Sequence, residues 1–292
     1  MRAALTLSIL LSVALAGCAV RVDTVCGVYR GHILVQEYAA KRPVRVPAGL
    51  KTEEQGRCVA KNLLAALTAK GLGGPAGYKV ALTSKAAQDA LGIDRPIAGV
   101  LLRHMLLADN STVRADWGAR PVFEPDLLVT VGDAAINDAE TPLDVLRHIS
   151  AIRPFIELAD LAVPEGTPLT LPIALALNAG ARLGVAGAPI PFAATEAFAD
   201  TLGSMAVVAR DARGREISRA PGSALLGHPL NAVIWLASEL KRQGRALKAG
   251  QVVSLGAFAA PRAPVAGDTV TVRYEGLAAD TLDTPEVRVR FR

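Results

Sequence analysis

The chain has 292 residues, of which 51% are hydrophobic, and this composition supplies a sizeable core and excludes a disordered protein. The formal net charge is only +5, the basic residues are scattered and aromatic residues make up 4%, so the sequence gives little support for nucleic-acid binding. A mildly basic surface suits a nearby membrane or a pocket for an anionic substrate.

Residues 1–17 have the pattern of a secretory signal peptide: Arg2, an apolar run, and small residues before Cys18. The apolar run is too short for a comfortable membrane span. The segment Leu15-Ala16-Gly17-Cys18 resembles the bacterial lipobox, which implies cleavage before Cys18 and lipid attachment there. Alanine at position 19, in place of aspartate, favours the outer membrane by the same resemblance. We therefore expect a lipid-anchored protein on the periplasmic face of the outer membrane.

After this signal, we expect residues 18–32 to form a tether and residues 33–292 to form one domain, since the sequence has no internal repeat or low-complexity linker. Two further cysteines are Cys26, in the tether, and Cys58. An oxidising compartment favours a disulfide between them. The alternative of two unpaired thiols stays open, because sequence alone does not show whether the two residues are close together.

The domain is expected to begin with helices. Residues 33–41 favour a helix that stops before two prolines. Thr52 and Gln55 have the spacing of a capping box, and the apolar periodicity behind them continues to Lys70. This pattern predicts a longer second helix.

A glycine-rich loop at residues 71–77 leads into a predicted strand at residues 78–82. Thr83 or Ser84 then caps a short helix. Lys79 lies within the predicted strand, where a lysine either extends to the surface or is held in a site. Taken alone, Lys79 fits the surface interpretation better.

Residues 121–131 are apolar and rich in β-branched side chains, and they predict a buried strand. Glu124 and Asp126 are two residues apart, so both carboxylates point to one face of this strand. Pro125, between them, cannot donate to a ladder, which is typical of a strand edge. The alternative role for the two acids is therefore capping or ion pairing at such an edge.

A helix is expected to start at Pro142, with Thr141 as its cap, and to stop near Arg153. The apolar segment that follows carries a third carboxylate, Glu157. Buried carboxylates need a cation, hydrogen bonds or a proton. If the three carboxylates converge, Mg²⁺ or Mn²⁺ is the ion that oxygen ligands of this kind favour.

The second half of the chain predicts a helix at 195–203, a β-hairpin that begins at 205, and an apolar helix started by Pro229. His228, just before that helix, is either a capping group or a pocket residue, and capping is favoured. Further strands are expected at 251–258 and 268–274. Strands and helices intermixed without a regular βαβ repeat predict an α+β fold.

Several motifs together resemble the 2-keto-4-pentenoate hydratase and 2-oxo-3-hexenedioate decarboxylase group of the fumarylacetoacetate hydrolase superfamily. The motifs are residues 77–85 (GYKVALTSK), 91–96 (LGIDRP), 99–101 (GVL) and 226–237 (LGHPLNAVIWLA). Their order and spacing hold from about Ile33 to Phe291. The resemblance implies a mixed β-roll or sandwich around a metal, with an N-terminal helical portion.

The resemblance implies roles for particular residues. Glu124, Asp126 and Glu157 match the three ligands of a divalent ion, Mg²⁺ or Mn²⁺, with Asp126 in place of a glutamate. Lys79 matches a lysine that moves protons near the substrate, and burial and the metal are expected to lower its pKa. The segments around Asn178 and Ser254 depart from the family pattern near the pocket. Substrate-binding residues are thus expected at Asn178, His228 and Ser254.

The activity implied is that of a metal-dependent lyase acting on a small 2-oxo or 2-hydroxydienoic acid by enolisation, as a hydratase or decarboxylase. One alternative is a periplasmic binding lipoprotein that keeps the fold and the metal without turnover. Another is hydrolysis of a C–C bond in an acylpyruvate. Assembly into a homo-oligomer stays open.

Overall fold

The structure, a computed structural model, describes residues 31–45, 49–277 and 284–292. In these residues the strands form two sheets. The larger sheet has the strand order β2 (Ile97–Leu102), β1 (Pro75–Ala81), β10 (Val252–Ser254), β5 (Pro121–Val131), β6 (Ile149–Asp160), β7 (Leu183–Ala186) and β3 (Leu106–Ala108). The smaller sheet has the order β4 (Ser111–Val113), β12 (Glu286–Phe291), β11 (Thr269–Glu275), β8 (Ala206–Arg210) and β9 (Glu216–Pro221).

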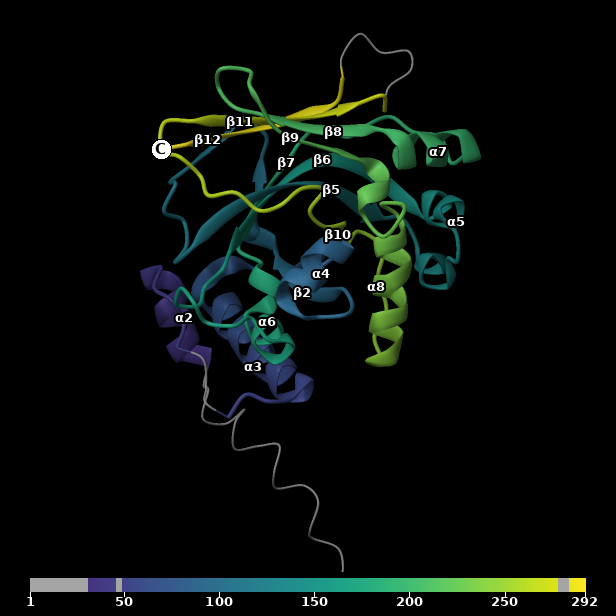
Figure 1. The fold of residues 1–292 in the computed structure, drawn as a ribbon. Helices are drawn as coiled ribbons and strands as arrows, with labels where there is room; N and C mark the ends of the chain where they lie inside the picture. The colour runs from purple at the N-terminus through teal and green to yellow at the C-terminus, as the bar shows by residue number, and fades with distance from the viewer. Residues whose placement is uncertain (1–30, 46–48, 278–283) are drawn as a thin grey trace, which may run out of the picture.

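The two sheets face one another, and their inner faces form the main core (Figure 1). Fully buried side chains come from both sheets and from helix α8 (Asn231–Arg242), for example Val129, Ile156, Val272, Val289 and Leu236. Burying each such side chain contributes about 1.5–3 kcal/mol. The alternating burial of β11 reflects its position, with one face on this core and one toward solvent.

The bounds of the other helices are α2 (Gly31–Ala40), α3 (Glu53–Leu67), α4 (Lys85–Leu91), α5 (Pro142–Arg147), α6 (Leu171–Ala176) and α7 (Glu196–Ser204). Helices α2, α3, α4 and α6 lie on the opposite side of the larger sheet from the smaller sheet, whereas α5 and α7 lie at one end of the two sheets (Figure 1). Helix α3 contacts α2 and α6, and its buried residues Val59, Leu63 and Leu67 join a second apolar cluster. The expected α+β fold with an N-terminal helical portion is confirmed.

The strongest local patterns of the sequence give elements at the expected places. Thr52 and Gln55 form the predicted capping box at the start of α3. The strand predicted at residues 121–131 coincides with β5. Ser84 caps α4, and Gly92 ends that helix in the left-handed conformation. Each of these elements is specified by side chains within a few residues.

The prediction that a helix runs from Pro142 to about Arg153 is wrong in its length. Helix α5 ends at Arg147, and β6 begins at Ile149. The residues after Arg147 pair with the end of β5, Ile149 with Val131 and Ala151 with Thr130. Tertiary pairing of these apolar residues thus overrides the helical pattern.

The interpretation of Glu124 and Asp126 as acids at a sheet edge is also wrong. Strand β5 lies between β10 and β6, so it is interior to the sheet. Pro125 is tolerated there because β10 pairs only with residues 128–130 of β5, and no ladder donor is lost at Pro125.

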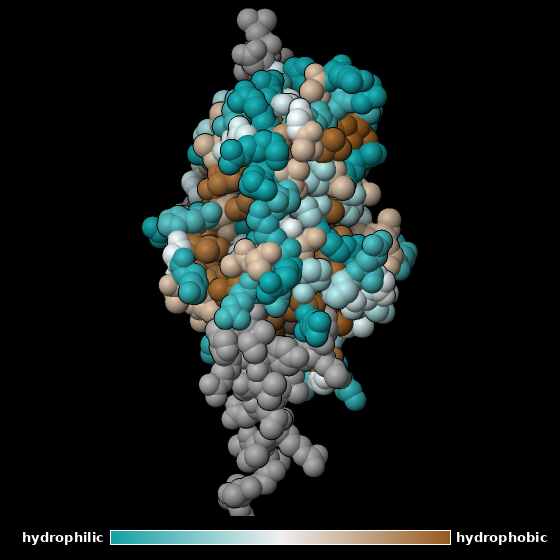
Figure 2. All heavy atoms as spheres, turned by 90° about the vertical axis from the view of Figure 1, so that its left-hand side faces the viewer, coloured by the Kyte–Doolittle hydropathy of each residue, from teal (hydrophilic) through white to brown (hydrophobic). Residues whose placement is uncertain are grey.

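The surface is mostly hydrophilic on the face shown in Figure 2, where hydrophobic residues appear as small separate areas. None of the described helices combines the length and the apolar character needed to cross a membrane.

Candidate active site

Glu124 and Glu157 face each other across the longest strand pair of the larger sheet. They are directly opposite in the register of β5 and β6. Side chains of such a pair have Cβ atoms about 5 Å apart, so the two carboxylates are forced close together. Glu157 is 2% exposed, which removes the water that would otherwise screen this repulsion.

Lys79 is the cation of this cluster. It lies on β1, is 2% exposed, and its Nζ contacts Glu157 Oε1. Burial opposes the charged ammonium, but the carboxylates of Glu157, Glu124 and Asp126 outweigh it and raise the pKa of Lys79 above its usual value. The lowered pKa expected from the sequence is therefore not found, because the acids around Lys79 hold its proton more strongly than burial repels it.

Glu124 carries the clearest sign of crowded negative charge. Burial raises its pKa to about 8, and the neighbouring Glu157 carboxylate contributes to the rise, against the opposing effect of Lys79. One lysine thus does not balance the acids that surround it. A buried cluster of this kind is typical of a site that also receives a cation.

Asp126 is fully buried and turned toward the backbone of neighbouring segments. Its Oδ1 accepts hydrogen bonds from the backbone N–H groups of Leu127 (2.5 Å) and Gly256 (2.9 Å), and its Oδ2 accepts one from Ser254 Oγ. Burial and the Glu157 carboxylate raise the pKa of Asp126, while these hydrogen bonds lower it. Both oxygens are already engaged.

Glu124, Asp126 and Glu157 all act on the charge of Lys79, and their assignment as three metal ligands stays a prediction. In the described part of the chain, no three side chains of histidine, cysteine, aspartate or glutamate stand close enough together to hold a metal ion. The oxygens of Asp126 accept hydrogen bonds from Ser254 and Gly256. Glu124 and Glu157 remain, and two carboxylates with water and substrate oxygens are a common way to bind Mg²⁺. The residues present fit a divalent ion through these two glutamates.

A cavity of about 580 Å³ opens beside this cluster, and Lys79, Glu124 and Glu157 lie in its wall. The end of β1, helix α4, residues 257–261 and three further residues, Leu177, Ala179 and Gly180, contribute to its lining. At the end of β1, Leu82 has a φ of +59°, a left-handed conformation that is strained for leucine. Strained backbone of this type concentrates at functional sites. The volume lies in the range usual for a small-molecule site.

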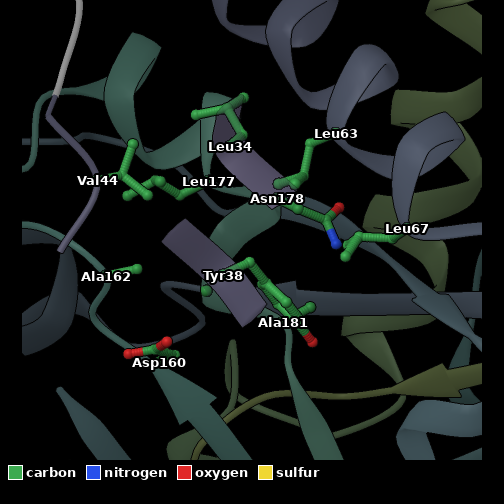
Figure 3. Close-up of a pocket in the computed structure, with 11 residues that line it drawn as sticks. Leu34, Tyr38, Val44, Leu63, Leu67, Asp160, Ala162, Leu177, Asn178 and Ala181 are labelled. Atoms are coloured by element: carbon green, nitrogen blue, oxygen red, sulfur yellow. The ribbon is translucent and has the colours of Figure 1, made fainter. Parts of the chain in front are cut away.

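The structure places the three expected substrate-binding residues outside this cavity lining. Ser254 is buried and bonded to Asp126, so it positions an acid. Asn178 is also buried and bonds the backbone of Val100 with both ends of its amide, at 2.7 and 2.8 Å. It borders a separate small pocket with Leu63 and Leu67 (Figure 3).

His228 is held in the turn before α8 by hydrogen bonds from both sides of its ring. Its Nδ1 accepts a hydrogen bond from the N–H of Leu230 (3.1 Å), and its Nε2 donates to the carbonyl of Ala199 (2.9 Å). Both ring nitrogens are thus occupied just before α8. These contacts leave no ring nitrogen for a substrate, but the capping role that the sequence favoured is not found, because α8 starts at Asn231 without a side-chain cap.

The cysteine predictions fall largely outside the described residues. Cys18, the lipidation site, and Cys26 both lie there. Cys58 lies on α3 and is disulfide-bonded, with its partner outside the described residues. The pairing of Cys26 with Cys58 therefore stays a prediction.

Sequence reasoning missed Tyr274, which holds the acid-bearing strands from the other sheet. Its hydroxyl donates to the carbonyl of Asp126 and accepts from the N–H of Phe155 (3.1 Å). Asp126 and Phe155 are partners in the ladder of β5 and β6. The only signal in the sequence is that Tyr274 continues the inward alternation of Val270 and Val272.

A second missed group is the buried ion pair of Asp160 and Arg182 (3.2 Å). Asp160 Oδ1 and Oδ2 also accept from the N–H groups of Arg120 and Ala119, at 2.8 and 3.1 Å. Arg182 stacks on the ring of Tyr38, 3.7 Å from its centroid. Asp160 lies in the cavity wall with its charge already paired.

Solved structures with the same arrangement of sheets define the fold. The 4-oxalocrotonate decarboxylase from Pseudomonas putida G7, complexed with magnesium and adipate, has a TM-score of 0.78 at 23% identity, over 92% of this chain and 98% of that protein. A fumarylpyruvate hydrolase from Pseudomonas aeruginosa, in complex with Mn²⁺ and pyruvate, has a TM-score of 0.52 at 14% identity, over 73% and 88%. The fold is thus that of the fumarylacetoacetate hydrolase-like proteins.

Sequence relatives narrow this class. The 2-keto-4-pentenoate hydratase 1 of Dechloromonas aromatica is 34% identical over 203 residues, 69% of this chain and 74% of the relative. The TodF product hydratase of Pseudomonas putida is 32% identical over 206 residues, 70% and 74%. A comparison with models of protein families gives no match. The chain belongs to the 2-keto-4-pentenoate hydratase family and is a hydratase-like lyase.

Proposed function

We propose that the protein is a divalent-metal-dependent hydratase of a small 2-hydroxydienoic acid, and that Glu124 and Glu157 hold the ion. The observation that carries this proposal is the buried contact of Lys79 with Glu157, beside Glu124, in the wall of a cavity of about 580 Å³. Enolisation of a 2-oxo acid requires acids that hold a metal ion and a group that transfers protons, in an apolar cavity. The two glutamates and Lys79 are the groups proposed for these roles.

Mg²⁺ or Mn²⁺ is the proposed ion, because both prefer oxygen ligands. Relatives whose structures contain magnesium with adipate, or Mn²⁺ with pyruvate, support this choice. When bound, such an ion polarises the keto oxygen of a chelating 2-oxo acid and stabilises the negative charge that develops there. Asp126 is proposed to support the site indirectly, because its oxygens accept hydrogen bonds from Ser254 and Gly256.

Lys79 is the proposed proton carrier. Conversion of a dienol to its keto form moves a proton from the enol oxygen to carbon, and hydration then needs a proton at the neighbouring carbon and removal of one from water. Lys79 Nζ, kept protonated by the surrounding carboxylates, gives a proton to carbon, and its neutral amine then accepts one.

The test is an assay of the purified protein with MgCl₂ and 2-hydroxypenta-2,4-dienoate, in which the loss of dienol absorbance is followed. We expect decay that disappears in Lys79→Met and Glu124→Gln. Decay no faster than in these variants, despite measurable metal binding, would favour the binding lipoprotein without turnover. Product analysis separates hydration from C–C cleavage, which would yield two fragments.

Decarboxylation is the second candidate. A 4-oxalocrotonate decarboxylase of Pseudomonas putida is 28% identical over 203 residues, 70% of this chain and 75% of that protein. The same enolate chemistry releases CO₂ when the substrate carries a suitably placed carboxylate. Release of CO₂ from 2-hydroxyhexa-2,4-dienedioate, measured beside the hydration assay, distinguishes the two activities.

We also propose that the mature protein starts at a lipidated Cys18 and faces the periplasm from the outer membrane. The support is the pattern of residues 1–17 and the Leu15-Ala16-Gly17-Cys18 motif. In membrane fractions, mass spectrometry of the N-terminal peptide should find a lipidated Cys18, and Cys18→Ala should release the protein from the membrane. An unmodified N-terminus at Met1 in the cytoplasm would refute this localisation.

A further inference from the structure

The cavity beside Lys79 is larger than the proposed reaction requires. A five-carbon dienol acid occupies on the order of 240 Å³, if each non-hydrogen atom takes about 30 Å³ as a water molecule does in the liquid. The cavity measures about 580 Å³. The cavity therefore has room beyond the reacting end of such a substrate.

The extra space is bordered by uncharged, mostly apolar side chains. Helix α4 contributes Ala86, Ala87, Ala90 and Leu91 to the lining, and other segments add Ile97, Leu161, Leu169, Leu177, Phe258 and Pro261. Leu91 is 37% exposed, one of two large hydrophobic side chains that are exposed in the described residues. Because Leu91 also lines the cavity, its apolar side chain is available to a ligand there.

The charges in the wall are unfavourable for a second carboxylate. Lys79 is the single cationic residue among the described residues that line the cavity, and it contacts Glu157. The other ionisable lining residues are the acids Glu124 and Asp160. Asp160 already uses Arg182 as its partner. A distal carboxylate inside this cavity would lose its water and find no unpaired cation.

We propose that the substrate is a monocarboxylic 2-oxo or 2-hydroxydienoic acid with an extended, uncharged apolar tail, and that dicarboxylic acids are disfavoured. This inference rests on the proposed function, since it assumes that the acid head lies beside Glu124, Glu157 and Lys79. The tail then lies along α4 and Phe258.

The test is calorimetric titration of the protein, with MgCl₂ present, by saturated 2-oxo acids that undergo no hydration. The series is 2-oxopentanoate, 2-oxohexanoate, 2-oxooctanoate and 2-oxoadipate. We expect Kd to fall about four-fold for each buried methylene. We expect 2-oxoadipate to bind at least about ten-fold more weakly than 2-oxohexanoate, which has the same chain length.

Two variants at one position give a matched control. Leu91→Arg places a cation at the cavity without removing a group of the acid cluster, and Leu91→Gln changes polarity without charge. We expect Leu91→Arg to tighten 2-oxoadipate binding by at least about five-fold relative to Leu91→Gln, as an added ion pair at a partly exposed site contributes about 1 kcal/mol. If both variants keep the wild-type ratio of Kd for 2-oxoadipate to Kd for 2-oxohexanoate, the result would count against a tail that reaches α4.

Failure of this inference can be distinguished from failure of the proposed function. If the dienol acid is turned over but 2-oxoadipate binds as well as 2-oxohexanoate, or tail length has no effect, the inference is overturned and the proposed function stands. If no 2-oxo acid binds and no dienol is consumed, the proposed function fails and the inference falls with it.

Discussion

Lys79 and Glu157 form a buried ion pair although two strands, β10 and β5, separate their own strands in the sheet. Both side chains are 3% exposed, so each depends on the other for compensation of its charge. The pair brings a proton carrier to the acid-bearing strand pair of β5 and β6. Replacing either partner alone therefore leaves an uncompensated charge.

Lys79→Met should lower kcat for the dienol acid by about 10²- to 10⁴-fold, the usual contribution of a positioned acid–base group. It should also destabilise the metal-free protein by about 3–5 kcal/mol, because Glu157 loses its partner. The double variant Lys79→Met/Glu157→Gln should be less destabilised than the sum of the two single variants. Denaturant unfolding and the absorbance assay measure these effects. Turnover retained within a few-fold would remove Lys79 from the chemistry.

The metal-free protein should lose stability as pH rises from about 5 to 8. The pKa of Glu124 rises from 4.5 in the free group to about 8 in the folded protein, because of burial and then Glu157. In this window the unfolded chain releases the Glu124 proton while the folded protein retains it, so higher pH favours unfolding. Thermal unfolding in EDTA at several pH values measures the effect.

MgCl₂ should reverse this trend, because an ion binds the deprotonated carboxylates and its stabilisation grows with pH. Glu124→Gln, which cannot titrate, is the matched control and should show a smaller slope in EDTA. A Tm in EDTA that increases steadily with pH would contradict the assignment of Glu124 as a crowded, buried acid.

Asp126 should contribute less to metal affinity than the two glutamates. Glu124→Gln and Glu157→Gln should abolish measurable Mg²⁺ binding, whereas Asp126→Asn should weaken it by about 10- to 100-fold, as for groups that support a ligand. The reason is that the Asp126 oxygens are bonded to Ser254, Leu127 and Gly256. Calorimetric titration with MgCl₂ measures the three affinities. Equal losses in all three variants would make Asp126 a direct ligand.

His228 should matter for stability and little for KM. His228→Ala removes the hydrogen bond to the N–H of Leu230 and should cost about 1 kcal/mol, the usual net effect of one lost hydrogen bond. Burial lowers the pKa of His228, so its contribution is present above pH 6.5 and is lost as pH falls below that value. Unfolding at pH 8 and pH 5 tests this, and a large rise in KM for His228→Ala would instead return it to the substrate site.

The sequence predicted the parts of this site that depend on local pattern. The two-residue spacing of Glu124 and Asp126 correctly put both on one strand, and the apolar context of Glu157 indicated only an apolar segment, which the structure shows to be strand β6. The direction in which Asp126 turns was not predictable, because Ser254 and Gly256 follow it by 128 and 130 residues. The contact of Lys79 with Glu157 also depends on sheet order, which no local pattern encodes.

The length of helix α5 shows the same limit. Thr141 and Pro142 specify its start through side-chain capping, and that start is correct. Its end depends on the pairing of Ile149 with Val131, a partner on another strand. Local chemistry therefore located starts and caps, and long-range pairing decided where the helix gives way to β6.

Tyr274→Phe should destabilise the protein by about 1–3 kcal/mol, because the N–H of Phe155 loses its buried acceptor. The hydroxyl lies between the acid-bearing strands and also donates to the carbonyl of Asp126, so Mg²⁺ affinity should fall as well. Tyr78→Phe is the matched control: its hydroxyl accepts only from the exposed Arg245 (2.9 Å), and its loss should change stability by less than about 0.5 kcal/mol. Denaturant unfolding and metal titration of both variants provide the measurements. Equal stability of the two variants would mean that the bridge from β11 to the acid-bearing strands contributes nothing.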